Sequence, residues 1–150
     1  MPEKETLERA RRDKEEGKAP TTQAGEFIRE EMHHIREGKH GARSTKQAIA
    51  IGLSKARRAG VKLPPPKKGA APRKTRRQAK RDLAKGSKGG RKSKSRTRSR
   101  ATTKALKRET RSAASRKALS RQAHATAGQR TRAEKSAAAR KAARTRAKNK

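Results

Sequence analysis

The sequence predicts a mainly α-helical protein, in which a small helical hairpin of the helix-turn-helix type stands between a charged N-terminal helix and a long basic tail. Two stretches between residues 20 and 63 repeat apolar side chains at intervals of three and four, the period of an amphipathic helix. A short glycine-containing segment joins them, as in a helical hairpin. From Pro64 onward the chain consists mainly of Lys, Arg, Ala, Ser, Thr and Gly. We therefore expect a charged helix in residues 1–19, a helical head in residues 20–63 and a disordered basic tail in residues 64–150.

The second apolar stretch of the head has residues that mark the start and the end of a helix. Ser44 and Gln47 form a capping box, in which the serine hydroxyl accepts from the Gln47 amide and the glutamine reaches back to the Ser44 amide. Gly60 suits the left-handed position after a helix, and Val61 is placed to close a Schellman motif. These features predict a helix over residues 45–59.

The first apolar stretch of the head predicts a helix over residues 22–37, with a threonine of the Thr21-Thr22 pair at its N-cap and Gly38 as its stop. Its apolar stripe consists of Ala24, Ile28, Met32 and Ile35, flanked by Phe27. The joint core of two such helices is small for a stable domain, so dimerisation or ligand binding would add stability.

The N-terminal segment, residues 3–16, is charged almost throughout, with Leu7 and Ala10 as its only apolar side chains. Opposite charges four residues apart, such as Glu5 and Arg9, support a helix by roughly 0.2–0.5 kcal/mol. Because an apolar face is missing, we expect a marginal, solvated helix without a function of its own.

The basic tail lacks the apolar residues that a core needs. In the whole chain 27% of residues are hydrophobic and the formal net charge is +34. Such a chain does not bury enough surface to offset its conformational entropy. Ala, Arg, Lys and Gln nevertheless favour helix, so we expect residues 101–127 and 133–147 to become helical when phosphates neutralise their repulsion.

The tail's charge predicts the function. Its 32 basic and three acidic side chains are typical of a polyanion-binding protein. We expect sequence-nonspecific DNA binding by charge neutralisation, in the manner of a nucleoid-associated or linker-histone-like protein. Duplex DNA is favoured over single-stranded RNA because aromatic side chains for base stacking are almost absent. Two alternatives stay open: an RNA- or ribosome-associated protein, and a protein-interaction module that the tail anchors to a polyanion.

Other classes of function find little support in the sequence. The chain has no cysteine, no apolar run long enough for a membrane span, and no apolar segment near the N-terminus for secretion, so we expect a cytoplasmic protein. A small core does not hold a preorganised site. We therefore expect no enzyme activity, no small-molecule substrate and no cofactor.

The candidate nucleic-acid-binding residues are lysines and arginines of the head and of the first part of the tail. They are Lys39, Arg43, Lys46, Arg57, Arg58, Lys62, Lys67, Lys68, Arg73, Lys74, Arg76, Arg77, Lys80, Arg81, Arg91, Lys92, Lys94, Arg96, Arg98 and Arg100. Within the head, Gly38 and Gly41 precede a helix N-terminus, where free amides and the helix dipole favour a phosphate. The alternative for residues 38–47 is a turn whose charges are solvated.

The histidines of the head offer a weaker candidate. His33, His34 and His40 lie near Glu30 and Glu37 in the sequence. Adjacent residues on a helix point roughly 100° apart, so His33 and His34 do not easily face one ion. We therefore predict solvated or packed histidines and no metal site.

Ile51 suggests self-association of the head. It lies on the opposite side of its helix from Leu53, so one partner helix does not cover both. Burial of an isoleucine contributes roughly 1.5–3 kcal/mol. We expect a homodimer through Ile51, with Ala48 and Ala59 nearby. In the alternative, Ile51 packs under residues 61–63 of a monomer.

Residues 25–63 resemble a family of small, uncharacterised bacterial proteins. The resemblance rests on two segments, Glu31-Met-His-His-Ile-Arg-Glu-Gly-Lys-His40 and Lys46-Gln-Ala-Ile-Ala-Ile-Gly-Leu-Ser-Lys-Ala-Arg57. Lys55 stands where that family has an acidic residue. The resemblance implies a bacterial source, and hence a place at the bacterial nucleoid, but no known activity or binding residues. By composition alone, the tail resembles the tails of linker histones and of bacterial histone-like proteins.

Overall fold

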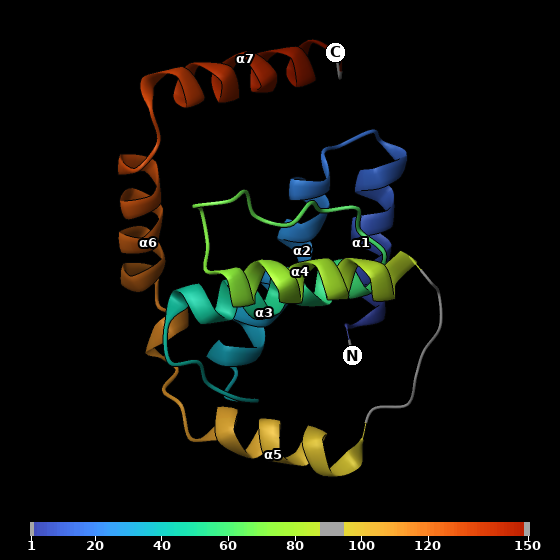
Figure 1. Ribbon diagram of the computed structural model, residues 1–150, viewed down its shortest axis with the longest axis vertical. Coiled ribbons are helices and arrows are strands. Elements are labelled where there is room, and N and C mark those ends of the chain that lie inside the picture. Colours follow the sequence, from blue (N-terminus) through green and yellow to red (C-terminus); the bar gives the residue numbers. More distant parts are fainter. Residues whose placement is uncertain (1, 88–94, 149–150) are drawn as a thin grey trace. The chain divides into compact units, whose positions relative to one another are not determined.

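The computed structural model describes residues 2–87 and 95–148, and within these ranges the chain is helical, without strands. Its helices are α1 (Lys4–Glu15), α2 (Pro20–Arg36), α3 (Thr45–Arg58), α4 (Arg73–Ser87), α5 (Arg96–Lys107), the 3-10 helix η1 (Ser112–Ala114), α6 (Arg116–Gly128) and α7 (Arg132–Lys148) (Figure 1). The chain divides into two compact units, Met1–Ser115 and Arg116–Lys150. The prediction of a mainly α-helical protein is confirmed.

α2 and α3 pack against each other at close range. Gly52 of α3 is buried, and a Cβ atom added to it would lie 2.8 Å from Ile28 Cα on α2. The two backbones therefore approach each other at a point where α3 has no side chain, which brings their apolar residues into contact.

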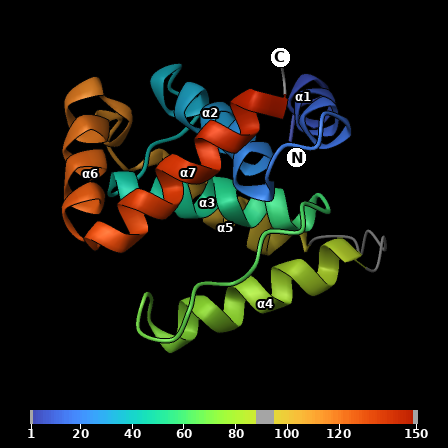
Figure 2. The ribbon, with the colours of Figure 1, turned by 90° about the horizontal axis from the view of Figure 1, so that it is seen from above.

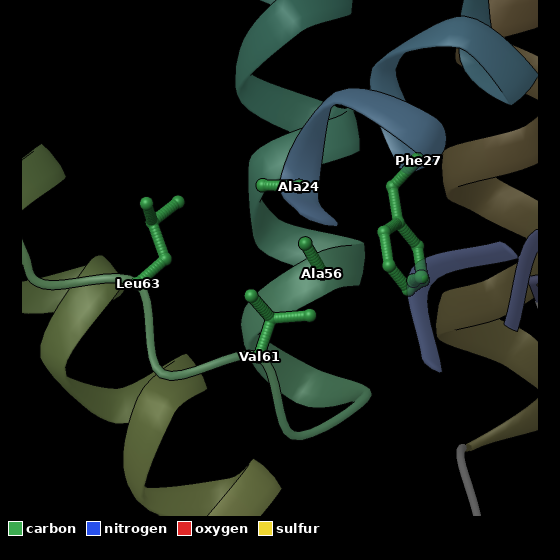
Figure 3. Packing of buried hydrophobic residues seen from close by; sticks show 6 residues of the cluster. Ala24, Phe27, Ala56, Val61 and Leu63 are labelled. Carbon is green, nitrogen blue, oxygen red and sulfur yellow. The ribbon is translucent and has the colours of Figure 1, made fainter. Parts of the chain in front are cut away.

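The core of the first unit is one small apolar cluster. Its buried members are Ala10, Ala24, Phe27, Ala56, Val61 and Leu63, and Leu53 packs against them (Figure 3). Phe27 is 1% exposed, and Val61 and Leu63 bring the chain after α3 back over the helices. Alanines fill much of the cluster, so the helices come close together and bury little apolar area per residue.

The ends of α3 agree with their prediction to within one residue. Ser44 Oγ accepts from the Gln47 amide at 3.2 Å, while Gln47 Oε1 accepts from the amide of Arg43 at 2.8 Å and not from that of Ser44. At the other end Gly60 has φ of 98°, and the Val61 amide donates to the Ala56 carbonyl at 3.1 Å. This is the predicted Schellman motif.

The start of α2 differs from its prediction. The helix begins at Pro20, with Ala19 as its N-cap and no side-chain cap, and Thr22 lies inside it. Proline is favoured at the first helical position because its φ is already helical and its missing N–H would have had no partner there. The C-terminus of α2 follows the prediction, because Gly38 has φ of 79° and ends the helix.

α1 packs against α2, whereas the sequence analysis expects a solvated helix. Its buried side chains are Thr6 and Ala10, one turn apart, and Leu7 is 38% exposed. Arg9 pairs with Glu5 and with Glu26 of α2, the latter at 2.6 Å between Nε and Oε2. α1 therefore packs through small side chains and ion pairs, without the apolar face whose absence led to the expectation of a solvated helix.

α4 lies alongside α3, although its residues belong to the predicted disordered tail (Figure 1, Figure 2). Ala79 and Asp82 are buried, and Asp82 Oδ2 accepts from Ser54 Oγ on α3 at 2.7 Å. A Cβ atom on Gly86 would lie 2.0 Å from the Arg57 carbonyl oxygen, so the helices touch there as well. The predicted disorder is not confirmed, because small and polar residues make a contact that hydrophobic composition does not reveal.

The end of α5 and the segment that follows it pack on the loop between α2 and α3 and on the start of α3. The amide of Gly41 donates to the carbonyl of Leu106 at 2.9 Å, and Thr45 Oγ1 donates to the carbonyl of Ala113 at 2.7 Å. Both hydrogen bonds have a backbone carbonyl as acceptor, a group that every residue carries, so composition gives no indication of them.

The second unit holds α6 and α7, neither of which contains a buried residue. α7 starts with a capping box, in which the Thr131 amide donates to Glu134 Oε2 at 2.9 Å and the Glu134 amide donates to Thr131 Oγ1 at 3.2 Å. Among the described residues, none of the helices combines the length and the apolar character needed to cross a lipid bilayer.

Two glycines inside helices test the close approach of α2 and α3. A Cβ atom on Gly25 would meet nothing within 4 Å, whereas one on Gly52 would meet the backbone of Ile28. Because alanine is better than glycine in a helix interior, Gly25→Ala should raise the free energy of unfolding by about 0.5–1 kcal/mol. Gly52→Ala should lower it by about 1–3 kcal/mol through overpacking. Urea denaturation followed by circular dichroism measures both, and equal changes would contradict the contact.

Candidate functional site

Among the residues that the structure describes, the Lys and Arg side chains that form ion pairs belong to the N-terminal part of the chain. In residues 2–87 and 95–148, every Lys or Arg that forms an ion pair lies at or before Arg58. The tail has three carboxylates: Asp82 is 2% exposed and pairs with Arg58 of α3, Glu134 caps α7, and Glu109 forms no ion pair within the described residues. The cations of the described tail therefore face solvent without a carboxylate partner.

α4 presents the densest group of these cations, which we call the α4 cationic face. Arg73, Arg77 and Arg81 are spaced by four residues, so they share one side of the helix. The side that packs on α3 is the opposite one, where Ala79 and Asp82 are buried. The complete α4 cationic face is Arg73, Lys74, Arg76, Arg77, Lys80, Arg81 and Lys85. Lys85 is missing from the sequence-based candidates, although it belongs to the same charge run.

α5 carries a second cationic surface. Arg96, Arg98 and Arg100, three of the predicted residues, are exposed on it. A shallow open depression on α5 is lined by Ser99, Arg100, Thr103, Lys104, Lys107 and Arg108. The last three of these are cations that the prediction omits. Of the remaining tail candidates, Arg91, Lys92 and Lys94 lie outside the described residues.

The structure removes Arg57 from the predicted contacts with nucleic acid. Its side chain is 6% exposed, with Nε donating to the Leu63 carbonyl and Nη2 to the Pro64 carbonyl, both at 3.2 Å. Burial lowers the pKa of Arg57, and the nearby Asp82 opposes that change. Arg57 therefore holds the turn after α3 in place, because these backbone carbonyls need donors.

The predicted phosphate site at residues 38–47 is filled by the chain itself. The amides of Gly41 and Ala42 donate to the carbonyls of Leu106 and Thr110 at 2.9 and 3.0 Å. The Arg43 amide donates to Gln47. The amides of Gly41, Ala42 and Arg43 are thus already in use, and the solvated-turn alternative fits better.

The other candidate nucleic-acid-binding residues of the head are accessible to solvent, but two of them already have partners within the chain. Lys39 forms ion pairs with Glu37 at 3.0 Å and with Glu3 at 3.3 Å, and hydrogen bonds to these carboxylates raise the pKa of Lys39. Arg58 donates to Ser54 Oγ at 2.7 Å. The remaining ones, Arg43, Lys46, Lys62, Lys67 and Lys68, are exposed.

The predicted self-association residues do not form one exposed surface. Ala48 is fully buried within the chain, Ile51 is half-buried and Ala59 is exposed. α4 packs on α3 from the side of Ser54, so α3 has a second neighbour that the sequence analysis did not expect. The physical reason for a dimer through Ile51 is therefore weakened.

A buried ion cluster lies between α2 and α3. Glu30 and Glu31 are 3% and 0% exposed, and Lys55 Nζ lies 3.1 Å from Glu30 Oε1 and 2.7 Å from Glu31 Oε2. The amide of Glu3 donates to Glu30 Oε2 at 3.0 Å, which ties the start of α1 to the cluster. Burial tends to raise the pKa of Glu30, but the Glu3 amide, Lys55 and Thr6 together lower it below the ordinary value.

Two histidines border this cluster. His40 Nε2 lies 3.4 Å from Glu31 Oε1, and His34 Nε2 lies 2.8 Å from Glu3 Oε1, a hydrogen bond that lowers the pKa of Glu3. His33 is exposed. The sequence-based candidates include His40, but the prediction against a metal site rests on the adjacent His33 and His34 and does not include Glu31. His40 reaches Glu31 only through the turn that ends α2.

The replacement Lys55→Met tests the cluster, since it keeps the apolar stem and removes the ammonium group. Loss of one partner strands two buried carboxylates, and because Lys55 keeps some access to solvent we expect a loss of roughly 2–3 kcal/mol of unfolding free energy at neutral pH. The stabilisation by Glu30, whose pKa is lowered from 4.5, is complete above that pH and is lost at lower pH. The difference from wild type should therefore shrink as the pH falls below 4.5.

Lys46→Met is the matched control, because Lys46 is exposed on the same helix and forms no ion pair within the described residues. Chemical denaturation across the pH range compares the two variants. Equal stabilities of Lys55→Met and Lys46→Met at neutral pH would show that the cluster contributes nothing.

The buried ion cluster lies within the part of the chain that matches a known protein family. Residues 17–68 match a family of unknown function, DUF6496. α1 and α4 to α7 lie outside this match. Neither the curated proteins nor the solved structures contain a match to the chain. The segment that holds Glu30, Glu31 and Lys55 is therefore similar to a family whose function is unknown.

Proposed function

We propose that this protein binds nucleic acid without sequence specificity, with duplex DNA as the preferred partner. The observation that carries the proposal is the α4 cationic face, whose opposite side packs on α3 through Ala79 and Asp82. The helix is thereby held in one orientation while its cations stay accessible. The only carboxylate of α4 is the buried Asp82, so nothing on the helix competes with a phosphate.

The mechanism is neutralisation of phosphates with release of counterions. Duplex DNA carries one negative charge per roughly 1.7 Å of its axis, and each phosphate contacted by Lys or Arg frees a condensed cation. Four residues of a helix rise roughly 6 Å, so Arg73, Arg77 and Arg81 meet several phosphates at once. α2 and α3, as a helix-turn-helix-like head, serve as the support for this face.

The choice of a duplex follows from the aromatic content. Phe27 is the one aromatic residue of the chain and is 1% exposed in the core. Recognition of single strands relies on bases stacked on exposed aromatic side chains, which this surface does not offer. Binding to the bacterial chromosome as a nucleoid-associated protein is the corresponding cellular role.

The salt dependence of binding measures the charge mechanism. If about ten cations contact phosphates, log K should fall against log salt concentration with a slope near −9. Arg73→Gln, Arg77→Gln and Arg81→Gln combined should make the slope shallower by about 2.7. Fluorescence anisotropy with duplexes of several sequences at a series of salt concentrations gives both values.

The matched control for this experiment is a triple variant of α1, with Arg11→Gln, Arg12→Gln and Lys14→Gln. It removes three positive charges from α1, a helix that carries none of the candidate nucleic-acid-binding residues. The slope of log K against log salt concentration should therefore stay nearly unchanged. Equal effects of the two triple variants, a slope shallower than about −3, or strong preference for one sequence would contradict the proposal. Tighter binding to duplex RNA would favour the RNA-associated alternative.

The second unit provides a further test. α6 and α7 have no buried residues, and helices of their length without packing are marginal in water. Phosphates remove the repulsion among their cations, so the helical circular dichroism signal of the full chain should rise when duplex DNA is added. A chain truncated after Ser115 should show no such rise. A full-chain signal that is already maximal without DNA would contradict this expectation.

A further inference from the structure

We propose that Glu31, His34 and His40 form a binding site for a divalent first-row transition metal, such as Zn²⁺. One carboxylate oxygen and one nitrogen from each ring lie within 4.8 Å of one another. The three side chains come from α2 and from the loop that follows it. The site is independent of the proposed binding of nucleic acid.

The donor atoms and their spacing suit such an ion. Imidazole nitrogen and carboxylate oxygen are common Zn²⁺ ligands at bond lengths of about 2.0–2.2 Å, which makes the edge of a tetrahedral site roughly 3.3 Å long. His40 Nε2 and Glu31 Oε1 are 3.4 Å apart, so an ion placed between them meets both at bonding distance. The donor atom of His34 lies within 4.8 Å of the other two, and its ring centroid is 6.2 Å from that of His40, so a shift of His34 toward His40 would complete the set.

In each histidine, the ring nitrogen that would not bind the metal has a hydrogen-bond acceptor nearby. His40 Nδ1 lies 3.1 Å from the Gly41 carbonyl oxygen, which only accepts hydrogen bonds, so Nδ1 carries the proton and Nε2 is left with its lone pair. His34 Nε2 lies 2.8 Å from Glu3 Oε1, and the same reasoning frees Nδ1 of that ring. Metal-ligating histidines typically donate their other N–H to a carboxylate or a backbone carbonyl in this way.

The carboxylate of Glu31 lacks hydrogen bonds to the described residues where the metal would bind. It is fully buried, and neither of its oxygens accepts a hydrogen bond from the residues that the structure describes. Lys55 Nζ lies 2.7 Å from Oε2 as an ion-pair partner, which leaves Oε1 facing His40. A buried carboxylate without hydrogen bonds is costly. A metal ion on Oε1 supplies the missing interaction.

The charges around the site also suit a cation. Glu30 and Glu31 share the single ammonium group of Lys55, so the buried cluster keeps a net negative charge. The side chains of His34 and His40 are 13% and 16% exposed, which gives a small ion access from solvent. Three protein ligands leave a fourth position for water. A metal held here would fasten the turn between α2 and α3.

The test uses the full chain without a histidine tag, freed of metal with a chelator and titrated with Co²⁺. We expect one Co²⁺ per chain with the strong visible absorption of four-coordinate Co²⁺, displaced by Zn²⁺. Calorimetric titration with Zn²⁺ should give the same stoichiometry. His40→Gln and His34→Gln should each weaken Zn²⁺ binding at least tenfold. Loss of a residue that only hydrogen-bonds to a metal ligand already weakens metal binding about tenfold or more, and loss of a ligand should cost at least as much.

His33→Gln is the matched control, because His33 neighbours His34 on the same helix but is exposed and outside the cluster. It should bind Zn²⁺ as the wild type does, and circular dichroism should show that all three variants keep their helix content. The absence of saturable binding, a weak six-coordinate Co²⁺ spectrum, or equal losses in His33→Gln and His40→Gln would overturn the proposal. A variant that unfolds is replaced by the alanine substitution at the same histidine, judged by the same criteria.

Discussion

The burial of Glu30 and Glu31 against Lys55 is the constraint on which the packing of the first unit depends. Each carboxylate reaches a second element, since Glu30 accepts from the Glu3 amide before α1 and Glu31 faces His40 in the loop before α3. A buried ion pair adds little stability in itself, because desolvation offsets the attraction, but the loss of one partner is costly. We interpret the cluster as a device that specifies one arrangement of α1, α2 and α3, which a core made largely of alanines would leave poorly determined.

Small residues make the rest of the packing possible. Gly52 lets α3 approach α2, and Gly86 lets α4 approach the end of α3. Close backbones bury few apolar atoms, so polar contacts such as Asp82 with Ser54 contribute to the same interfaces. The arrangement suits a chain of high positive charge, because α4 needs only a narrow face for packing and keeps the rest of its circumference for Lys and Arg.

Sequence alone predicts the features that arise between neighbours in the chain. The ends of α3 depend on Ser44, Gln47 and Gly60, all within or next to the helix, and the cations of α4 follow from a local run of charge. The packing of α4 on α3 was not predicted, because it rests on a single buried alanine, Ala79, and on the polar contact of Asp82 with Ser54, which hydrophobic periodicity does not detect. The burial of Arg57 and the position of His40 could not be predicted from the sequence, because both depend on turns of the folded chain.

Gly41 shows how the head and the tail share one set of backbone groups. Its carbonyl faces His40 Nδ1, its amide donates to the Leu106 carbonyl, and a Cβ atom on it would lie 2.0 Å from the carbonyl oxygen of Glu109. The loop that orients the His40 ring is therefore the loop that receives the chain after α5. Because the amides of Gly41 and Ala42 are used in this way, they are not available to an anion. The lysines and arginines of α4 and α5 have no carboxylate partner within the described residues, so their side chains stay available to an anion.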